Sequence, residues 1–387
     1  MKVEHQVRTF EQIYKSYDGT LPLHRFLPAY FKQHRQMGSS DRRWATRYIY
    51  AFYRLGKALW DMPLLTRLAV ADFLCHSTGS LVVEAYLSEL APSVTLTVEE
   101  KVSLIRAVYP DFDVNEVFGW SSDLSDPIDI LPFNLSFFKQ PDLFIRVKKG
   151  ALSTVSEQLH QQGIPLKQLS EYTLALPNGT KLEALNSISG LYQVQDWSSQ
   201  KTGAYFEPQK YDYWWDCCAA SGGKSLLLHA LEPDIQLLVS DIRESSLQNL
   251  EERFRQAGIR KYQAKVMDLL HNNDPILHHY AFDGILLDAP CSGSGTWGRT
   301  PEMLYYFDPA KIGNYARLQK VIASNVVTYL KPGKPLIYMT CSVFKAENED
   351  VVQYISENLP LRLEKAALIK GYQDQADSMF VARFIKI

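Results

Sequence analysis

Two cysteines, Cys291 and Cys341, each follow a short apolar run that is typical of a buried β-strand. The runs span residues 284–287 and 335–339, and Asp288 stands between the first run and its cysteine. Because ligands of α/β sheets bind beyond the carboxyl ends of the strands, we expect both thiols to lie beside a ligand cleft. A single cysteine after a strand is usually a small core residue. Two cysteines at equivalent strand ends, one of them close to a carboxylate, indicate thiol chemistry instead.

Methylation of carbon 5 of cytosine is a reaction that would use a nucleophilic thiol, an acid that contacts N3 and a second group that assists elimination. That carbon is a poor nucleophile, but addition of a thiolate to carbon 6 and of a proton to N3 gives an enamine that can attack a methyl donor. A base then removes the proton from carbon 5, and the thiolate leaves. Because a free thiol has a pKa of about 8.5, a nearby charge or a favourable pose must assist it. Lys224 and Arg299 are the candidate charges.

A segment of small residues followed by carboxylates predicts an adenosyl cofactor site. The segment follows one predicted strand and opens a helix, so its backbone amides can approach a ligand closely. Asp241 ends the next predicted strand, 18 positions after Gly223, where dinucleotide-binding folds hold a ribose hydroxyl pair. Asp216, Asp268 and Asp288 complete a set of four carboxylates at strand ends, which suits an adenosyl group and would repel a polyphosphate. The candidate cofactor-binding residues are Cys218, Ala219, Ala220, Ser221, Gly222, Gly223, Lys224, Asp241, Asp268 and Asp288.

Two other interpretations of this segment carry less weight. Gly223-Lys224-Ser225 resembles the end of a phosphate-binding P-loop, but that motif requires a glycine at the position of Cys218. The glycines could also serve packing alone, an interpretation that the downstream carboxylates disfavour. No set of metal ligands is expected.

From residue 213 onward, apolar runs alternate with amphipathic helices. A helix is expected over residues 243–257, with Gly258 as its stop signal. This alternation predicts an α/β fold with a doubly wound, mostly parallel, Rossmann-like sheet. The expected strands are residues 213–217, 235–241, 264–268, 282–288 and 334–341.

The rest of the chain divides at two changes of pattern. Residues 1–130 show helical periodicity, and Ser39-Ser40-Asp41 supplies capping residues for a helix through Trp44. Residues 131–195 are expected to form a small α/β connecting domain, with strands at 143–147 and 172–176 around a helix at 153–161. Residues 196–387 form the predicted catalytic domain.

Charge is distributed unevenly, although the net charge is only −2. Residues 1–57 hold eleven Lys and Arg against four Asp and Glu, whereas residues 58–130 hold three against twelve. The basic segment indicates RNA binding or, with similar weight, a solvated helix surface. The chain has no apolar run of 18 residues and no secretory signal, and its five cysteines are expected to be free thiols, so a cytoplasmic location is expected. The oligomeric state stays open, with a monomer compatible.

The motifs together resemble those of the Sun (Fmu) family of RNA cytosine-5 methyltransferases, which includes bacterial rRNA enzymes. The segment D-C-C-A-A-S-G-G-K-S is similar to the family's D-x-C-A-A-P-G-G-K-T, with Ser221 in place of proline. D-A-P-C-S-G-S-G and T-C-S match closely, and residues 131–387 also carry counterparts of V-Q-D-x-x-S-Q, R-x-P-E and E-N-E. More weakly, residues 40–54 resemble a NusB-like helical domain that precedes the catalytic domain in the rRNA branch.

This resemblance implies roles for individual residues. Cys341 of T-C-S would be the nucleophile, and Cys291 of P-C-S would help to release the product. Asp288 would contact the target base at N3, and S-adenosyl-L-methionine would occupy the segment 218–224. The implied substrate is a cytosine in RNA, most naturally rRNA.

Three alternatives remain open. The chain could be a non-catalytic RNA-binding or ribosome assembly factor that retains the fold, although the retained cysteine pair disfavours this. It could methylate tRNA at carbon 5 of cytosine. A methyltransferase acting on an exocyclic nitrogen would need no thiol and typically shows N-P-P-Y or D-P-P-Y, whereas this chain has D-A-P-C.

Overall fold

The computed structural model describes residues 2–387, which divide into two compact units. We call them the helical unit and the sheet unit. No helix in the described part of the chain is long and apolar enough to cross a membrane. The helical unit comprises the chain up to Leu124 with Ile128–Gln140 and Thr296–Asp308, and the sheet unit comprises Ser125–Pro127, Pro141–Gly295 and Pro309–Ile387.

Amphipathic helices build the helical unit, as their periodicity predicts. Its longest helix, α3, buries an aromatic face that includes Tyr48 and Phe52. The N-cap of this helix is Gly38, one residue before the predicted capping segment 39–41, which instead forms the first turn. There the Asp41 side chain accepts the Gly38 amide (3.2 Å). The helices of this unit are α1 (Val3–Ser16), α2 (Leu23–Gln33), α3 (Ser39–Arg54), α4 (Leu64–Cys75), α5 (Leu81–Tyr86), α6 (Val98–Val108), α7 (Ile130–Ser136) and α13 (Met303–Tyr306).

The segment Thr296–Asp308, which directly follows the D-A-P-C-S-G-S-G motif, packs into the helical unit. Arg54 is fully buried there and donates to the carbonyl oxygens of Phe137 and Gly298, each at 2.8 Å. Glu302 accepts the Leu23 amide at the start of α2 (2.9 Å). A buried arginine and a buried carboxylate thus hold the segment by hydrogen bonds to backbone groups.

A seven-stranded sheet with strand order β10-β11-β9-β8-β5-β6-β7 organises the sheet unit. Strands β5 to β9 are parallel, and β11 is antiparallel to both β9 and β10. The predicted doubly wound sheet is confirmed, and the five predicted strands match within about two residues at each end. The strands are β5 (Tyr213–Asp216), β6 (Gln236–Asp241), β7 (Gln263–Val266), β8 (Gly284–Asp288), β9 (Pro335–Thr340), β10 (Leu361–Ile369) and β11 (Met379–Lys386).

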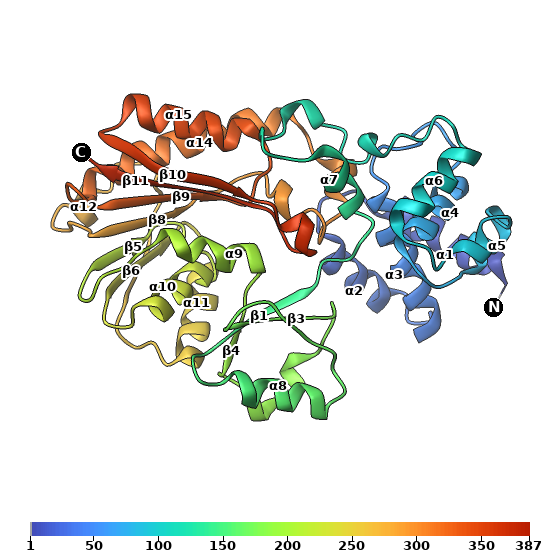
Figure 1. Cartoon of the computed structure of the whole chain (residues 1–387), viewed down its shortest axis with the longest axis horizontal. Helices are drawn as coiled ribbons and strands as arrows, with labels where there is room; N and C mark the ends of the chain where they lie inside the picture. Colours follow the sequence, from blue (N-terminus) through green and yellow to red (C-terminus); the bar gives the residue numbers. More distant parts are fainter. Residues whose placement is uncertain (1) are drawn as a thin grey trace. The chain divides into compact units, whose positions relative to one another are not determined.

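Helices cover both faces of this sheet (Figure 1). On one face, α10 (Gly223–Leu231) and α11 (Glu244–Ala257) pack against Trp214 of β5. On the other face, α14 (Ala310–Val326) and α15 (Glu349–Asn358) pack with Trp215. Adjacent tryptophans therefore anchor opposite cores, which explains why the strands read as continuous apolar runs. The short helix α12 (Asp274–Leu277) precedes β8.

A smaller four-stranded sheet, with order β2-β3-β1-β4, lies between residues 143 and 194. Its helix α8 packs Val155 and Leu159 onto strand residues such as Ile145. The predicted strands and helix of this region are confirmed. The elements are β1 (Leu143–Val147), α8 (Leu152–Gln161), β2 (Lys167–Gln168), β3 (Thr173–Leu176) and β4 (Tyr192–Val194), followed by α9 (Trp197–Lys201).

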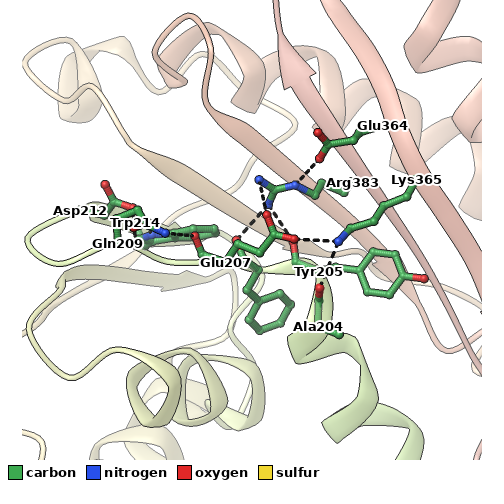
Figure 2. A network of polar contacts seen from close by, with 10 residues as sticks. Ala204, Tyr205, Glu207, Gln209, Asp212, Trp214, Glu364, Lys365 and Arg383 are labelled. Carbon is green, nitrogen blue, oxygen red and sulfur yellow. Dashed lines mark hydrogen bonds and ion pairs between the residues drawn. The ribbon is translucent and has the colours of Figure 1, made fainter.

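A polar network joins the chain that enters β5 to the antiparallel strands β10 and β11 (Figure 2). Arg383 of β11 donates to Glu364 (2.6 Å), pairs with Glu207 (3.3 Å) and donates to the Phe206 carbonyl (3.0 Å). Lys365 also donates to Glu207, at 2.8 Å. These bonds fix where β5 begins, and therefore where its carboxyl end lies.

Replacing Gly56 by alanine should destabilise the helical unit by at least about 2 kcal/mol. Gly56 has φ +56°, and a Cβ there would lie 1.9 Å from the Val117 carbonyl oxygen, a backbone atom that cannot move aside. Gly313→Ala, at an exposed position of α14, is the matched control, since its Cβ would meet nothing closer than 4.0 Å. We expect the control to stabilise by about 0.5–1 kcal/mol. Calorimetric unfolding of both variants checks this, and equal effects would contradict it.

Candidate active site at the carboxyl edge of the sheet

Three neighbouring parallel strands end in aspartates. Asp216, Asp241 and Asp288 are the last residues of β5, β6 and β8, as the sequence predicts. Because β5 lies between β6 and β8, the chain crosses from one half of the sheet to the other at this point. Open α/β sheets bind their ligands at such a switch point. Asp268 lies two residues beyond the end of β7 rather than at the strand end.

The two cysteines that the sequence singles out lie side by side. The Sγ atoms of Cys291 and Cys341 are 3.4 Å apart, and both thiols are partly exposed. Strands β8 and β9 pair in parallel with Asp288 opposite Met339, which brings the two following loops together. The Gly295 amide also donates to the Cys341 carbonyl oxygen (2.8 Å), so the loops are tied at a second point.

The electrostatic environment of Cys291 disfavours its thiolate. The pKa of Cys291 is raised well above its usual value, first by its hydrogen bond with Cys341 and then by burial and by the negative charge of Glu347. Either sulfur can be the donor in the contact between the two thiols. Lys224 and Arg299 are the candidates for a positive charge beside a thiol. Lys224 donates a hydrogen bond to Asp288, and Arg299 belongs to the helical unit, near Arg54.

The cofactor-type loop is shaped by Asp241. Its carboxylate accepts the Ala220 amide (3.0 Å) and the Arg243 amide (2.9 Å). Ala220 is exposed and has φ +45°, a left-handed conformation that non-glycine residues rarely adopt outside functional sites. Gly222 serves packing, since a Cβ there would lie 2.8 Å from Leu250, whereas Gly223 has open space at its Cβ position out to 4.0 Å.

Ser221, which stands where the family has proline, takes part in a further contact. Arg253 of α11 donates to its carbonyl oxygen (3.0 Å) and to its hydroxyl (3.2 Å). Gln195 of the V-Q-D motif donates to the Gly223 carbonyl oxygen (3.2 Å). The loop is thus held from α11 and from the segment after β4, in addition to Asp241.

Two carboxylates at this edge are open to a ligand. The Asp288 carboxylate accepts a hydrogen bond from the Lys224 ammonium group (3.1 Å), and the Asp288 side chain is 30% exposed. Asp268 is 34% exposed and lies 3.4 Å from His271 in its own loop. Lys224 itself is nearly buried, so Asp288 stays partly exposed while its charge is balanced by the lysine.

Asp216 differs from the other three carboxylates and corrects one expectation. Its side chain is completely buried, with one oxygen accepting the Ser225 hydroxyl (2.6 Å) and the other without a partner. Burial is the main reason that its pKa is raised to about 7. Asp216 therefore lies beneath the loop and is not placed to meet a ligand. Of the other three carboxylates, Asp268 and Asp288 are partly exposed, and Asp241 is nearly buried with both oxygens bonded within the chain.

Sequence reasoning assigned no role to Glu347, the first acid of E-N-E. It is fully buried behind the cysteines, and its two oxygens accept the Ser292 amide (2.9 Å) and the Ser342 hydroxyl (2.7 Å). The available signal was its position six residues after Cys341, in the polar run E-N-E. Motif spacing alone does not show that a side chain turns inward.

Replacing Asp216 by asparagine should flatten the pH dependence of stability. The native state binds the Asp216 proton more tightly than the unfolded chain does, so wild-type stability falls as pH rises from about 4 to about 7. Asparagine does not titrate in this range. The free energy of unfolding of Asp216→Asn relative to wild type should therefore rise by about 3 kcal/mol between pH 5 and pH 8. Thermal unfolding across this range measures the difference. Asp234→Asn, at an exposed site, is the control, and parallel profiles for Asp216→Asn and wild type would refute the assignment.

Comparisons with known proteins agree with this geometry. Residues 204–384 match the sequence model of the family described as 16S rRNA methyltransferase RsmB/F. The ribosomal RNA small subunit methyltransferase B of Shewanella oneidensis is 29% identical over 214 residues, which are 51% of this chain and 49% of that protein. The protein of the same name from Salmonella arizonae is 31% identical over 216 residues, 51% of this chain and 47% of that protein. The matched region of this chain spans about half the length of these relatives.

Solved structures share the fold. The crystal structure of PH0851 superposes with a TM-score of 0.69 and 21% identity, covering 92% of this chain and 93% of that one. NSun6 from Pyrococcus horikoshii, solved with SFG, gives a TM-score of 0.60 and 17% identity, covering 70% and 97%. The part of the chain that matches the RsmB/F sequence model, residues 204–384, holds both cysteines and the carboxylates of the sheet edge, and the motifs that resemble the Sun family lie largely within it.

Proposed function

We propose that this chain is an S-adenosylmethionine-dependent RNA methyltransferase that modifies carbon 5 of a cytosine, with rRNA as its substrate. The observation that carries the proposal is the 3.4 Å separation of the Cys291 and Cys341 sulfurs, which follow the ends of two adjacent parallel strands, one of them ending in Asp288. Exocyclic nitrogen methylation needs neither thiol. A ribosomal substrate would also place the protein in the cytoplasm.

The carboxyl edge of the sheet has the groups that an adenosyl cofactor requires. Open space at Gly223 and the exposed left-handed Ala220 allow a ligand to approach the loop backbone. Asp241, Asp268 and Asp288 would hold the cofactor together with residues 218–224. When bound, S-adenosylmethionine supplies an electrophilic methyl group. Asp241 would act largely by holding the loop, since its own chain already occupies both carboxylate oxygens.

Cys341 is the nucleophile in this proposal. Its thiolate forms a bond to carbon 6 of cytosine, the double bond between carbons 5 and 6 is lost, and N3 takes up a proton. The proton reaches N3 through Asp288. Lys224 lies 3.1 Å from that carboxylate and can supply it with another proton. Carbon 5 then accepts the methyl group.

Cys291 acts in the second half of the reaction. Loss of the carbon 5 proton to a base restores the double bond between carbons 5 and 6 and breaks the bond between sulfur and carbon 6, and N3 gives back the proton that it took up. The departing sulfur is Cys341, and the protonated Cys291 beside it can donate a hydrogen bond to the thiolate as it forms. Its raised pKa supports this division, because the thiolate is the nucleophile, and a thiol that keeps its proton attacks poorly but still has a hydrogen to donate.

Cys291→Ala should accumulate a covalent complex with RNA, and Cys341→Ala should be inactive without forming one. The first variant can still attack carbon 6 but releases product slowly, whereas the second lacks the attacking sulfur. Denaturing gels of each variant incubated with RNA and S-adenosylmethionine measure the complex. Cys218→Ala, a partly exposed thiol in the cofactor loop, is the thiol control and should form no lasting complex. A complex with Cys341→Ala but none with Cys291→Ala would reverse the roles.

The substrate is tested by bisulfite sequencing of RNA from cells with and without the protein. Loss of one methylated cytosine in rRNA is the expected result. Loss of a site in tRNA would assign the enzyme to tRNA instead, and no lost site would favour a non-catalytic assembly factor.

Asp241→Ala should weaken S-adenosylmethionine binding at least about tenfold, since it releases the Ala220 amide and removes a candidate ribose ligand. Titration calorimetry of the whole protein gives the affinity. Glu244→Ala, an exposed acid at the start of α11, is the control and should bind as wild type does. Unchanged affinity in Asp241→Ala would remove this residue from the cofactor site.

A further inference from the structure

The segment after Cys341 contains a fully buried carboxylate that contacts the loops of both cysteines. Glu347 accepts the amide of Ser292, the residue after Cys291, at 2.9 Å. Its other oxygen accepts the hydroxyl of Ser342, the residue after Cys341, at 2.7 Å. One side chain therefore bridges the two positions that directly follow the reactive sulfurs.

Neighbouring groups hold this carboxylate in place. Gln319 of α14 donates to the same oxygen as Ser292 (3.1 Å), and its amide group also donates to the Pro290 carbonyl oxygen (3.0 Å). The Tyr338 hydroxyl donates to the Glu347 carbonyl oxygen (2.6 Å). Among the ion pairs described for residues 2–387, none joins Glu347 to a cation. Neutral donors from β9, α14 and the two loops surround it, so its negative charge is not cancelled locally.

The hydroxyls around Glu347 extend the bridge. The Ser342 oxygen lies 3.2 Å from the hydroxyls of both Ser292 and Ser294, and Ser294 accepts the Val343 amide (2.9 Å). The two loops therefore meet in a buried polar cluster directly behind the sulfurs. Such a cluster is rigid when its hydrogen bonds are satisfied, and removing one acceptor leaves several donors unpaired.

We propose that Glu347 is a positioning residue for the cysteine pair, with two effects. Its hydrogen bonds fix the separation of the Cys291 and Cys341 sulfurs, and its uncancelled charge disfavours a thiolate on Cys291. The attacking sulfur is thereby confined to Cys341. This inference rests on the proposed methyl transfer, but its consequences for the thiols can be measured without RNA.

The raised pKa of Cys291 agrees with this arrangement. The negative charge of Glu347 is one of its causes, after the contact with Cys341 and burial. The pKa of Tyr315 of α14 is raised, first by burial and then by Cys291 and Glu347, so its hydroxyl stays protonated and adds no charge of its own. Lys224 is engaged by Asp288.

Glu347→Gln tests the charge. The pH midpoint for alkylation of Cys291, followed by mass spectrometry of its peptide, should fall by about one unit relative to wild type. Glu349→Gln is the matched control: it is the second acid of the same motif and accepts the Ser125 hydroxyl (2.9 Å) rather than either cysteine loop. Its midpoint should equal that of wild type. A wild-type midpoint in a folded Glu347→Gln protein would overturn the electrostatic effect.

Ser342→Ala tests the bridge separately, because it removes the Ser342 hydroxyl with its contacts to Glu347, Ser292 and Ser294 while keeping the Glu347 charge. We expect the Cys291 midpoint to stay raised, whereas kcat for methyl transfer falls up to about 100-fold with little change in KM for RNA, since the sulfurs are less well placed. Unchanged kcat would overturn the positioning effect. If no variant or wild-type protein methylates RNA while the Glu347→Gln midpoint still falls, the proposed function fails and the electrostatic effect of Glu347 stands.

Discussion

The parallel pairing of β8 with β9 is the constraint on which the site depends. With Asp288 opposite Met339, both strands deliver their next residues to the same edge at the same height. The loops that follow the two strands therefore lie next to each other, and the sulfurs of Cys291 and Cys341 lie 3.4 Å apart. A shift of register by one residue would send alternate side chains to the opposite face and separate the pair. The two cores on either side of the sheet, anchored by Trp214 and Trp215, make such a shift costly.

Buried charges at this edge are handled in two ways. Lys224 balances Asp288 directly, which leaves a carboxylate that can reach a ligand. Asp216 and Glu347 instead are fully buried and bound by uncharged donors. Burial raises the pKa of Asp216 to about 7, so this group keeps its proton in acid, whereas the charge of Glu347 acts on the neighbouring Cys291. The first arrangement suits a group that must contact substrate. The second suits groups that set the shape and the electrostatic potential of a site.

The sequence alone predicts the fold and most of the residues at the carboxyl edge of the sheet, because both follow from the periodicity of apolar residues. Apolar runs ending in Asp241 and Asp288 identify strands and their carboxyl ends, and the pattern of small residues identifies the loop between β5 and α10. It was insufficient for Asp216 and Glu347. Both are acids beside a motif, and the direction in which such a side chain points depends on packing between segments that are distant in sequence. Asp216 is therefore grouped by sequence with the carboxylates at strand ends that suit a ligand, although it is buried, and Glu347 receives no role from its motif.

The motifs that resemble the family also differ in what they can establish. Glu302 of R-x-P-E holds the start of α2, and Gln195 of V-Q-D holds the Gly223 carbonyl oxygen, so both serve architecture. A relative that had lost activity but kept the fold would keep these residues for stability. Cys341 has no comparable structural role, because its thiol is partly exposed and its described hydrogen bond is to the other thiol. The paired thiols and the exposed oxygen of Asp288, rather than the number of motifs, therefore favour catalysis over a purely structural role.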